Sequence, residues 1–427
     1  NNKYYLTYKI DLPLIEELPA KFTYFVDANT GRIIDVIDNL FFYDVSGTVT
    51  GLEWEDPFTD GIQLEKPFIN NYIEINNQQI RTDKNGDYFL EGLEGQSELS
   101  SYLRGPWVSV YNAQAQSSQH NYLFNENSNH EWNWNSEDNS YLNGESNVFY
   151  HVNRIHDYAV SVGATEMNFN MAANVDIQDY CNAFYQSRSV NFFQFGNGCE
   201  NTAVISDIIL HEYGHGIVDE LNPSLLDALY WDQPGNIHEA IADYWACTIN
   251  ENPSQGEGFY VGDSEGLRIC DSDDRYPEDY NPEPHSGCQI LSGALWDVRD
   301  ILGKEYLDPL IVEALRLQPI YYTEFLEALI IVDDDNADLS DGTPNIVDIC
   351  SSFVDNHGIL SSYCAGYTSL PIIHFDDSNS GPVTENVYII GTIAAPLGKT
   401  INYYSLEYLN NFGEYISEGI TLPNNGE

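Results

Sequence analysis

The spacing of apolar residues changes along this chain, and that change limits what the chain can fold into. Up to about residue 125, apolar and polar residues alternate, as in "YKIDL" and "TYFVD", which is the period of a half-buried strand. In 146–163, 201–221 and 236–250 they recur every third or fourth position, which is the period of a helix. Strand-like patterns return after residue 367. The sequence therefore predicts an α+β, multidomain fold, with a mainly helical domain flanked by β-rich modules.

This pattern predicts four modules. Residues 1–45 hold alternating strands joined by a "DANTG" turn, and residues 46–125 form a second β-rich module in which "KNGD" (84–87) predicts a hairpin. An Asn-rich stretch marks the start of the helical domain, residues 126–366. A further β module occupies residues 367–427.

The charge balance limits the partners of the chain. It has 16 Lys and Arg residues against 67 Asp and Glu residues, a formal net charge of −51. A surface this acidic repels phosphate backbones, which argues against nucleic acid as a partner. No apolar run approaches the ~20 residues of a membrane-spanning helix. The start lacks the basic and apolar segments of a signal peptide, so we expect that one has been removed or that this is a piece of a longer precursor. We expect a monomer.

The seven cysteines include no CxxC motif, which argues against a structural zinc site of thiolates. Three pairs lie 14 to 18 residues apart, a spacing that suits local disulfides: Cys181/Cys199, Cys270/Cys288 and Cys350/Cys364. Cys247, in a predicted helix, is left over. Disulfides predict an oxidising setting, so we expect a secreted or cell-surface protein. The alternative is seven reduced core cysteines in a cytosolic protein.

The stretch "HEYGH" (211–215) places two histidines four residues apart within a helical pattern. Four residues turn a helix about 40° past one revolution, so His211 and His215 project from one face and can share a metal ion. Glu212 lies about 100° round from His211, beside the position of a metal-bound water, as a general base does. The alternative is a core helix with an exposed His-Glu-His patch.

A second helical segment offers the missing ligand. In "GNIHEAIADYWA" (235–246), Glu239 and Asp243 lie four residues apart on one face. Glu239 is the predicted third ligand, and Asp243 is predicted to accept a hydrogen bond from the other nitrogen of a ligand histidine. The alternative is that Asn236 and Glu239 form a variant capping box that opens a helix. His238 points about 100° away from Glu239 and is not a predicted ligand.

HExxH followed about two dozen residues later by ExxxD resembles the gluzincin metallopeptidases, which include thermolysin-like and fungalysin-like enzymes. The resemblance implies one zinc ion held by His211, His215 and Glu239, with Glu212 as the base. "CNAFYQ" (181–186) resembles the edge strand upstream of the zinc helix in thermolysin-like enzymes. That likeness implies that Asn182 and the backbone of Ala183 hold the substrate as an added strand.

Two further segments resemble parts of these enzymes. "YWDQPGNIHE" (230–239) resembles the stretch before the glutamate ligand, which implies that Tyr230 donates to the oxyanion. "EPHSGCQILSGALWDVR" (283–299) resembles a fungalysin-like segment, which implies that His285 is a second electrophile. The family's Gly-Glu is here Cys288-Gln289, and an alignment on "QILSG" instead puts Gln289 in that place. The spacing from His215 to Glu239 falls between those of the two families.

The flanking modules also resemble parts of such precursors. Residues 1–45 resemble the C-terminal end of a propeptide, which implies a zymogen, and residues 46–125 resemble a carboxypeptidase-regulatory-like β-sandwich. Residues 367–427 resemble the start of an immunoglobulin-like module.

An acidic loop follows the last long helical pattern. It contains five aspartates whose negative charges repel one another, and a bound calcium ion would reduce that repulsion: Asp333, Asp334, Asp335, Asp338 and Asp341. It does not match the EF-hand, because Leu339 stands where that loop requires glycine. The alternative to a calcium site is a solvated turn.

These observations predict a secreted zinc endopeptidase that acts on proteins or peptides through a metal-activated water. Two other hypotheses stay open. One is a non-catalytic adhesion protein on a decayed peptidase scaffold, although both the base and the ligands are intact. The other is an aminopeptidase, although we find no separate motif that grips a substrate amine.

Overall fold

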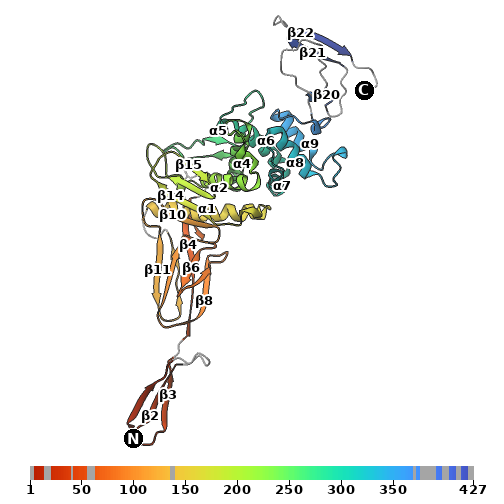
Figure 1. Cartoon of the computed structure of the whole chain (residues 1–427). Coiled ribbons are helices and arrows are strands. Elements are labelled where there is room, and N and C mark those ends of the chain that lie inside the picture. Colours follow the sequence, from red (N-terminus) through yellow and green to blue (C-terminus); the bar gives the residue numbers. More distant parts are fainter. Residues whose placement is uncertain are drawn as a thin grey trace.

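The computed structural model describes residues 4–13, 21–39, 42–54, 63–134 and 140–368, and then four short segments, 372–375, 391–396, 403–409 and 415–421. Figure 1 shows a small N-terminal sheet, a larger β-rich module, a central domain that combines helices with a sheet, and C-terminal strands. The prediction of a chain that combines helices and sheets is confirmed, whereas a mainly helical central domain is not confirmed and the division into four modules stays a prediction.

The N-terminal sheet has three antiparallel strands in the order β1-β2-β3. They are β1 (Thr7–Asp11), β2 (Phe22–Asp27) and β3 (Ile33–Asp38). The predicted "DANTG" turn joins β2 to β3. In that turn the Asp27 carboxylate accepts hydrogen bonds from the amides of Asn29 and Thr30, both at 2.9 Å, and Gly31 has a φ of +71°. The turn therefore forms from local interactions, as its sequence predicts.

The β-rich module consists of two sheets that share one apolar core. One sheet has the order β11-β9-β6-β7, and in the other β5, β8, β12 and β13 all pair with β4. The strands are β4 (Phe42–Trp54), β5 (Gln63–Pro67), β6 (Tyr72–Ile75), β7 (Gln78–Arg81), β8 (Asp87–Glu94), β9 (Ser97–Tyr102), β11 (Gln119–Phe124), β12 (Ser128–Asn129) and β13 (Trp132–Asn133). β4 begins ahead of the boundary predicted at residue 45. β12 and β13 lie beyond the boundary predicted at 125.

The chain turns at "KNGD" as predicted, with the amide of Gly86 donating to the carbonyl oxygen of Asp83 at 3.0 Å, but this turn does not close a hairpin. The strands on either side of it, β7 and β8, belong to different sheets. The tight hairpin instead joins β6 to β7 through Asn76 and Asn77, whose φ values are 49° and 67°. Two successive positive φ angles suit the right-handed twist of a two-residue hairpin, and Asn tolerates them.

The central domain is built on a four-stranded sheet in the order β10-β14-β16-β15. Its strands are β10 (Val108–Asn112), β14 (Met171–Ile177), β15 (Ala183–Gln186) and β16 (Ser189–Phe193). β10 comes from the segment assigned to the second β module, but it pairs in parallel with β14. β15 pairs antiparallel with β16 and forms one edge of the sheet.

Helices and one short pair of strands, β17 with β18, make up the rest of this domain. The long ones are α1 (Ser140–Ser161), α2 (Ser206–Leu221), α4 (Gln233–Asn250), α6 (Gln289–Leu302), α7 (Lys304–Arg316) and α8 (Tyr322–Asp333). The shorter elements are η2 (Thr165–Met167), η3 (Thr202–Val204), α3 (Ser224–Asp227), β17 (Ser254–Gln255), β18 (Arg268–Ile269), α5 (Pro284–Gly287), η4 (Leu339–Asp341), α9 (Ile346–Cys350), the π-helical turn η5 (Ser351–Asn356) and η6 (Ser362–Cys364). Among the described residues, no helix is both long enough and apolar enough to cross a membrane.

The C-terminal region contributes two strand pairs. β19 (Ile372–Phe375) pairs with β20 (Gly391–Ala394), and β21 (Tyr403–Leu409) pairs with β22 (Tyr415–Thr421). Much of the predicted immunoglobulin-like module lies outside the described residues, and that resemblance stays a prediction.

Helices α2 and α4 approach each other very closely. A Cβ atom on Gly214 of α2 would lie 2.9 Å from the Cα atom of Ala242 on α4. Only glycine leaves room for this approach, since the neighbouring atom belongs to the backbone. The small residue inside "HEYGH" is therefore explained by helix packing.

A buried ionisable pair joins the β-rich module to the central domain. Glu53 at the end of β4 is fully buried, and its Oε2 atom lies 3.2 Å from Nε2 of His151 on α1. Burial lowers the pKa of His151, and the Glu53 carboxylate opposes that effect. His151 is thus a contact between modules.

Two of the three predicted disulfides are confirmed and one is wrong. Cys181–Cys199 and Cys350–Cys364 are bonded. Cys270 instead lies against Cys247, with 3.0 Å between the sulfur atoms, because the chain after β18 packs on α4. Cys288, which precedes α6, contacts the carbonyl oxygen of His285 at 3.2 Å.

A pair of stacked histidines lies in the β-rich module. His120 on β11 and His130 have Nε2 atoms 2.7 Å apart, and both rings stack on Trp132. Burial lowers the pKa of His120 to about 4, and the neighbouring His130 adds to the effect. In the unfolded chain such a ring has a pKa of about 6.5, so between these two values only the unfolded chain binds the proton.

We therefore expect acid to destabilise this module through His120. Stability is fully present above pH 6.5 and is lost as the pH falls toward 4. The His120→Gln variant cannot take up this proton. On going from pH 7.5 to 5, the thermal midpoint of the parent should fall about 2–4 °C further than that of the variant, the shift that ~1 kcal/mol produces after discounting for solvent screening of a half-exposed ring. Equal shifts in both proteins would show that His120 is not the group responsible.

Candidate active site

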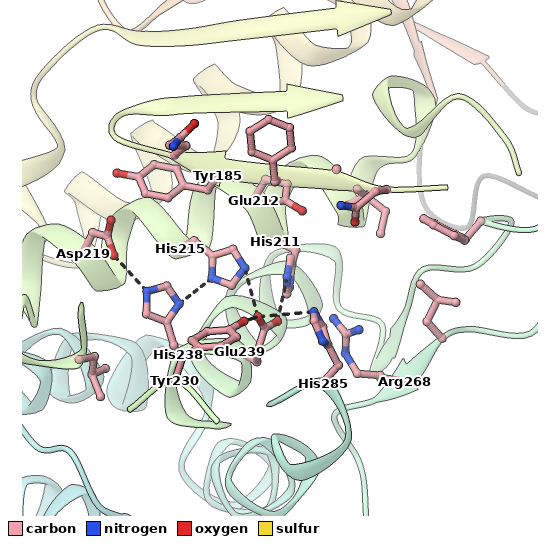
Figure 2. A pocket seen from close by; sticks show the side chains of 18 of the residues that line it. Tyr185, His211, Glu212, His215, Asp219, Tyr230, His238, Glu239, Arg268 and His285 are labelled. Carbon is pink, nitrogen blue, oxygen red and sulfur yellow. Dashed lines mark hydrogen bonds and ion pairs between the residues drawn. The ribbon is translucent and has the colours of Figure 1, made fainter. Parts of the chain in front are cut away.

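The two histidines of "HEYGH" lie on the buried face of α2. The rings of His211 and His215 stand edge to face, with centroids 4.5 Å apart. Both turn an Nε2 atom toward Glu239 on α4 (Figure 2). His211 Nε2 lies 3.4 Å from Oε2 of Glu239, and His215 Nε2 lies 3.7 Å from Oε1.

These three side chains meet the geometric needs of a metal site. One ligand atom from each lies within 4.8 Å of the others, and all three residues are buried. No other group of three or more His, Cys, Asp or Glu in the described part of the chain converges in this way. The Oε2 atom of Glu239 is buried and accepts no hydrogen bond. Two imidazole nitrogens and one carboxylate oxygen around such a point fit zinc.

The helix that supplies Glu239 begins earlier than the capping interpretation suggested. α4 starts at Gln233, whose amide donates to the side chain of Asp232 at 2.8 Å, and Pro234 occupies its first turn. Asn236 does not cap this helix. Its side chain donates to the carbonyl oxygen of Asn281 and to the hydroxyl of Tyr322.

Behind His211 lies an acid–base pair that is buried with it. Asp243 Oδ1 lies 2.8 Å from His211 Nδ1, and Arg268 donates two hydrogen bonds of 2.7 Å to the same carboxylate. Burial alone would raise the pKa of Asp243, but Arg268 and His211 hold it well below its usual range. Asp243 therefore remains an anion that orients the first histidine. Arg268 was not predicted from the sequence, because its contact with Asp243 spans 25 residues.

Behind His215 lies a different arrangement. His215 Nδ1 lies 2.8 Å from Nδ1 of His238, and His238 Nε2 lies 3.0 Å from Oδ1 of Asp219. His238 is not part of the converging group of His211, His215 and Glu239, but it contacts His215. Sequence reasoning assigned no role to His238 or Asp219.

Burial and neighbouring charges set the protonation of the ligands in the metal-free site. Burial lowers the pKa of both histidines, but Asp243 and Glu239 outweigh this for His211 and raise its pKa to about 10. His215 keeps a pKa well below its usual value, because burial dominates. Burial also works against the charge on Glu239, yet the histidines hold its pKa well below the usual range. A metal ion thus meets an anionic carboxylate and one neutral imidazole.

Glu212 lies beside this group and is almost fully buried. Its Oε2 atom has no hydrogen-bond partner, and its carboxylate accepts a hydrogen bond from the backbone N–H of Tyr185 on β15. Burial raises the pKa of Glu212 to about 7. The charge of His211 lowers this pKa, and the negative charge of Glu239 raises it. A carboxylate with this pKa can take up and release a proton near neutral pH.

Two further side chains point at the same centre (Figure 2). The Tyr230 hydroxyl donates to Oε1 of Glu239 at 2.5 Å, and His285 Nε2 lies 3.6 Å from that oxygen. Glu283 holds the other ring nitrogen of His285 at 2.9 Å. Burial raises the pKa of Tyr230, so its phenol stays a donor. Gln289 lies elsewhere, since its side-chain oxygen accepts from the amide of Ile269 at 3.2 Å.

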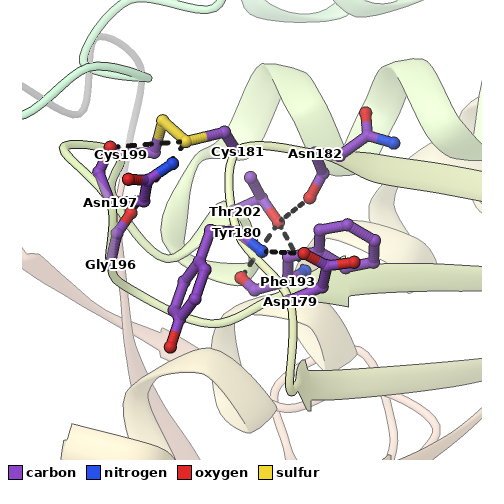
Figure 3. The surroundings of a disulfide bond; sticks show 9 residues. All are labelled: Asp179, Tyr180, Cys181, Asn182, Phe193, Gly196, Asn197, Cys199 and Thr202. Carbon is purple, nitrogen blue, oxygen red and sulfur yellow. Dashed lines mark hydrogen bonds between the residues drawn. A yellow bond between two sulfur atoms is a disulfide. The ribbon is translucent and has the colours of Figure 1, made fainter.

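A cavity of about 910 Å³ opens over these groups. Its wall includes the edge strand β15 with Asn182 and Ala183, and the opposite side includes Tyr230, Arg268 and His285. Figure 3 shows how this edge is fixed. The Cys181–Cys199 disulfide lies just before β15, and the carbonyl oxygen of Asn182 accepts from the Thr202 hydroxyl at 3.1 Å.

The acidic loop does not gather its carboxylates into a comparable group. Asp333 is buried and accepts hydrogen bonds from Thr343, Asn345 and Tyr306. Its oxygens are therefore occupied within the protein. Asp338 caps a short turn by accepting from Ser340. The structure gives the calcium prediction no support.

No protein-family model matches the chain, and no curated protein matches it. Among solved structures, it is similar to the precursor of protealysin, a metalloproteinase from Serratia proteamaculans, with a TM-score of 0.47 and 13% sequence identity. The match covers 59% of this chain and 87% of that one. A likeness this weak leaves the function to be inferred from the geometry of the site.

The converging ligands generate a prediction about metal content. We expect Glu239→Ala to weaken zinc binding by more than the about 10–100-fold that the loss of an outer hydrogen-bond partner costs, because a direct ligand is lost. Elemental analysis of the purified protein and competition with a chelator measure this. The matched control is Glu305→Ala, at an exposed glutamate on α7. Unchanged zinc content in Glu239→Ala would mean that the third ligand lies elsewhere.

Proposed function

We propose that this chain is a zinc-dependent endopeptidase of the gluzincin kind. The observation on which the proposal rests is the combination of His211, His215 and Glu239 with a buried, unpartnered oxygen of Glu212. A structural metal site is closed by four protein ligands, whereas three ligands and an adjacent base leave a position for water. The site also opens into a cavity.

His211, His215 and Glu239 would hold a zinc ion, which would supply Lewis acidity toward a substrate carbonyl and lower the pKa of a water molecule. Glu212 then accepts a proton from that water, whose oxygen adds to the carbonyl carbon. Tyr230 and His285 donate hydrogen bonds to the carbonyl oxygen as negative charge develops on it. Glu212 passes its proton to the amide nitrogen as the carbon–nitrogen bond breaks, so that an acid and an amine leave.

The edge strand supports a peptide as the substrate. β15 lies at the end of its sheet, and the unpaired side of an edge strand offers backbone groups to an extended chain. We propose that the backbone of Ala183 and the side chain of Asn182 bind the substrate there. This mode needs no free amino terminus, which favours an endopeptidase over an aminopeptidase. A casein substrate with blocked amino groups distinguishes the two.

The compartment follows from the cysteines. Two disulfides are present, and such bonds persist in oxidising surroundings. We propose that the protein acts outside the cytoplasm, and that residues 1–45 belong to a propeptide. A non-catalytic adhesion protein is the second candidate, favoured by the β-rich regions that precede and follow the central domain in the chain.

Glu212→Gln tests the proposed mechanism. The amide cannot accept the proton of the water, so the rate should fall about 10²–10⁴-fold, the contribution typical of general base catalysis. Zinc content should not change, because Glu212 is not a ligand. The measurements are hydrolysis of blocked casein and elemental analysis of the same sample. The control is Glu220→Gln, one glutamate further along α2.

Each outcome has a distinct meaning. Full activity in Glu212→Gln would sink the assignment of the base. A parent protein that binds zinc but cleaves no protein substrate would favour the adhesion hypothesis. If the parent protein binds no zinc, "HEYGH" is part of a core helix and not of a metal site.

A further inference from the structure

The second zinc-site histidine is supported by another histidine. From the site outward, His215, His238 and Asp219 form a row in which Nδ1 of His215 lies 2.8 Å from Nδ1 of His238, and Nε2 of His238 lies 3.0 Å from Asp219 (Figure 2). The side chains of His238 and Asp219 are only 11% and 16% exposed. Water therefore has little room to replace either contact.

With His238 neutral, the donors and acceptors in this row have one consistent arrangement. The Asp219 carboxylate only accepts, so Nε2 of His238 carries a hydrogen. Nδ1 of a neutral His238 is then a lone pair, which accepts, so Nδ1 of His215 carries a hydrogen. His215 Nε2 is left with its lone pair, and this is the atom that faces Glu239. The row fixes the tautomer that binds a metal.

The row also ties together the two helices that supply the ligands. His215 and Asp219 lie one turn apart on α2, whereas His238 is the residue before Glu239 on α4. A shift of one helix along the other breaks both contacts of His238. His211 is held differently, since a carboxylate paired with Arg268 contacts it directly.

We propose that His238 and Asp219 are positioning residues that set the tautomer and ring orientation of His215. This inference rests on the proposed zinc site but not on peptidase activity. It concerns metal affinity, which is measured without a substrate.

Three variants test it by their zinc dissociation constants. His238→Ala should weaken zinc binding about 10–100-fold, the usual cost of losing an outer-shell partner. His238→Asn should restore most of the loss, because the amide oxygen occupies the place of Nδ1 and accepts from His215. The zinc affinity of Asp219→Asn should lie between those of His238→Ala and His238→Asn. Parent-like affinity in His238→Ala, or equal weakness in the Ala and Asn variants, would overturn the proposal.

A spectroscopic readout keeps the test independent of zinc. Nitrogen-15 correlation spectra of the imidazole rings in the metal-free protein should show His215 as the Nδ1–H tautomer. In His238→Ala the Nε2–H form should gain population. Spectra in which the parent already carries the hydrogen on Nε2 would contradict the inference, even if the protein bound zinc and cleaved casein.

A separate observation concerns the cysteines that the spacing paired wrongly. Cys247 on α4 and Cys270 after β18 are both buried, with 3.0 Å between their sulfur atoms. The backbone holds the two segments together here, since the Cys270 amide donates to the carbonyl oxygen of Pro253 at 2.7 Å and the Cys247 thiol lies 3.4 Å from that oxygen.

We infer that Cys247 and Cys270 form a third disulfide. During folding in an oxidising compartment, the two thiols lose two protons and two electrons to a small-molecule disulfide, which is reduced to two thiols. The new bond ties the segment before Cys270 to α4. That segment includes Arg268, which holds Asp243.

A thiol count decides this second inference. Protein made under oxidising conditions is denatured without reductant, alkylated with iodoacetamide and digested. We expect one alkylated cysteine, Cys288, and a linked peptide pair that contains Cys247 and Cys270. Three alkylated cysteines, or a peptide that links Cys288 to either of the others, would overturn it.

Discussion

The close packing of α2 on α4 is the contact on which the rest of the site depends. Gly214 permits it, because any side chain there would meet the backbone of Ala242. At this separation the histidines of α2 and the glutamate of α4 point into one space without a loop between them. Sites built on packed helices hold their side chains more firmly than sites on loops. The same contact brings His238 to His215 and Asp243 to His211.

Three carboxylates are buried in the site, and the charge of each is balanced by different neighbours. Asp243 is neutralised by Arg268, and Glu239 is surrounded by histidines. Glu212 has no cation of its own within hydrogen-bond reach, so burial raises its pKa to about 7. Glu212, whose negative charge is balanced least by neighbouring positive charge, is thus the carboxylate with a pKa suited to proton transfer. Its role follows from the way the other two are paired.

The sequence predicted features that depend on interactions between residues close together in the chain. The spacing of His211 and His215 on one helix and the "DANTG" turn are each encoded within a few residues, and two cysteine pairs close short loops. Glu239 was predicted from its own helical segment, although its approach to the histidines depends on helix packing. Features that depend on distant contacts were missed or misassigned. β10 pairs with a strand of another predicted module, and Cys270 meets Cys247 because of the way a loop packs on α4. Arg268 and His238 gained roles only when the fold brought partners to them.

The two walls of the cavity differ in how they are held, and this difference bears on how the site works. The wall that carries His211, His215 and Glu239 is held by buried hydrogen bonds, such as that of His238 to His215 and those of Arg268 on β18 to Asp243. The other wall includes the edge strand β15, which has no neighbouring strand along one side among the described residues, although Ala183 and Tyr185 pack against the core. There the Cys181–Cys199 bond and the Thr202 hydroxyl replace the missing strand contacts. An edge held in this way keeps its backbone groups free for an added strand, while the amide of Tyr185 on the same strand still donates to Glu212.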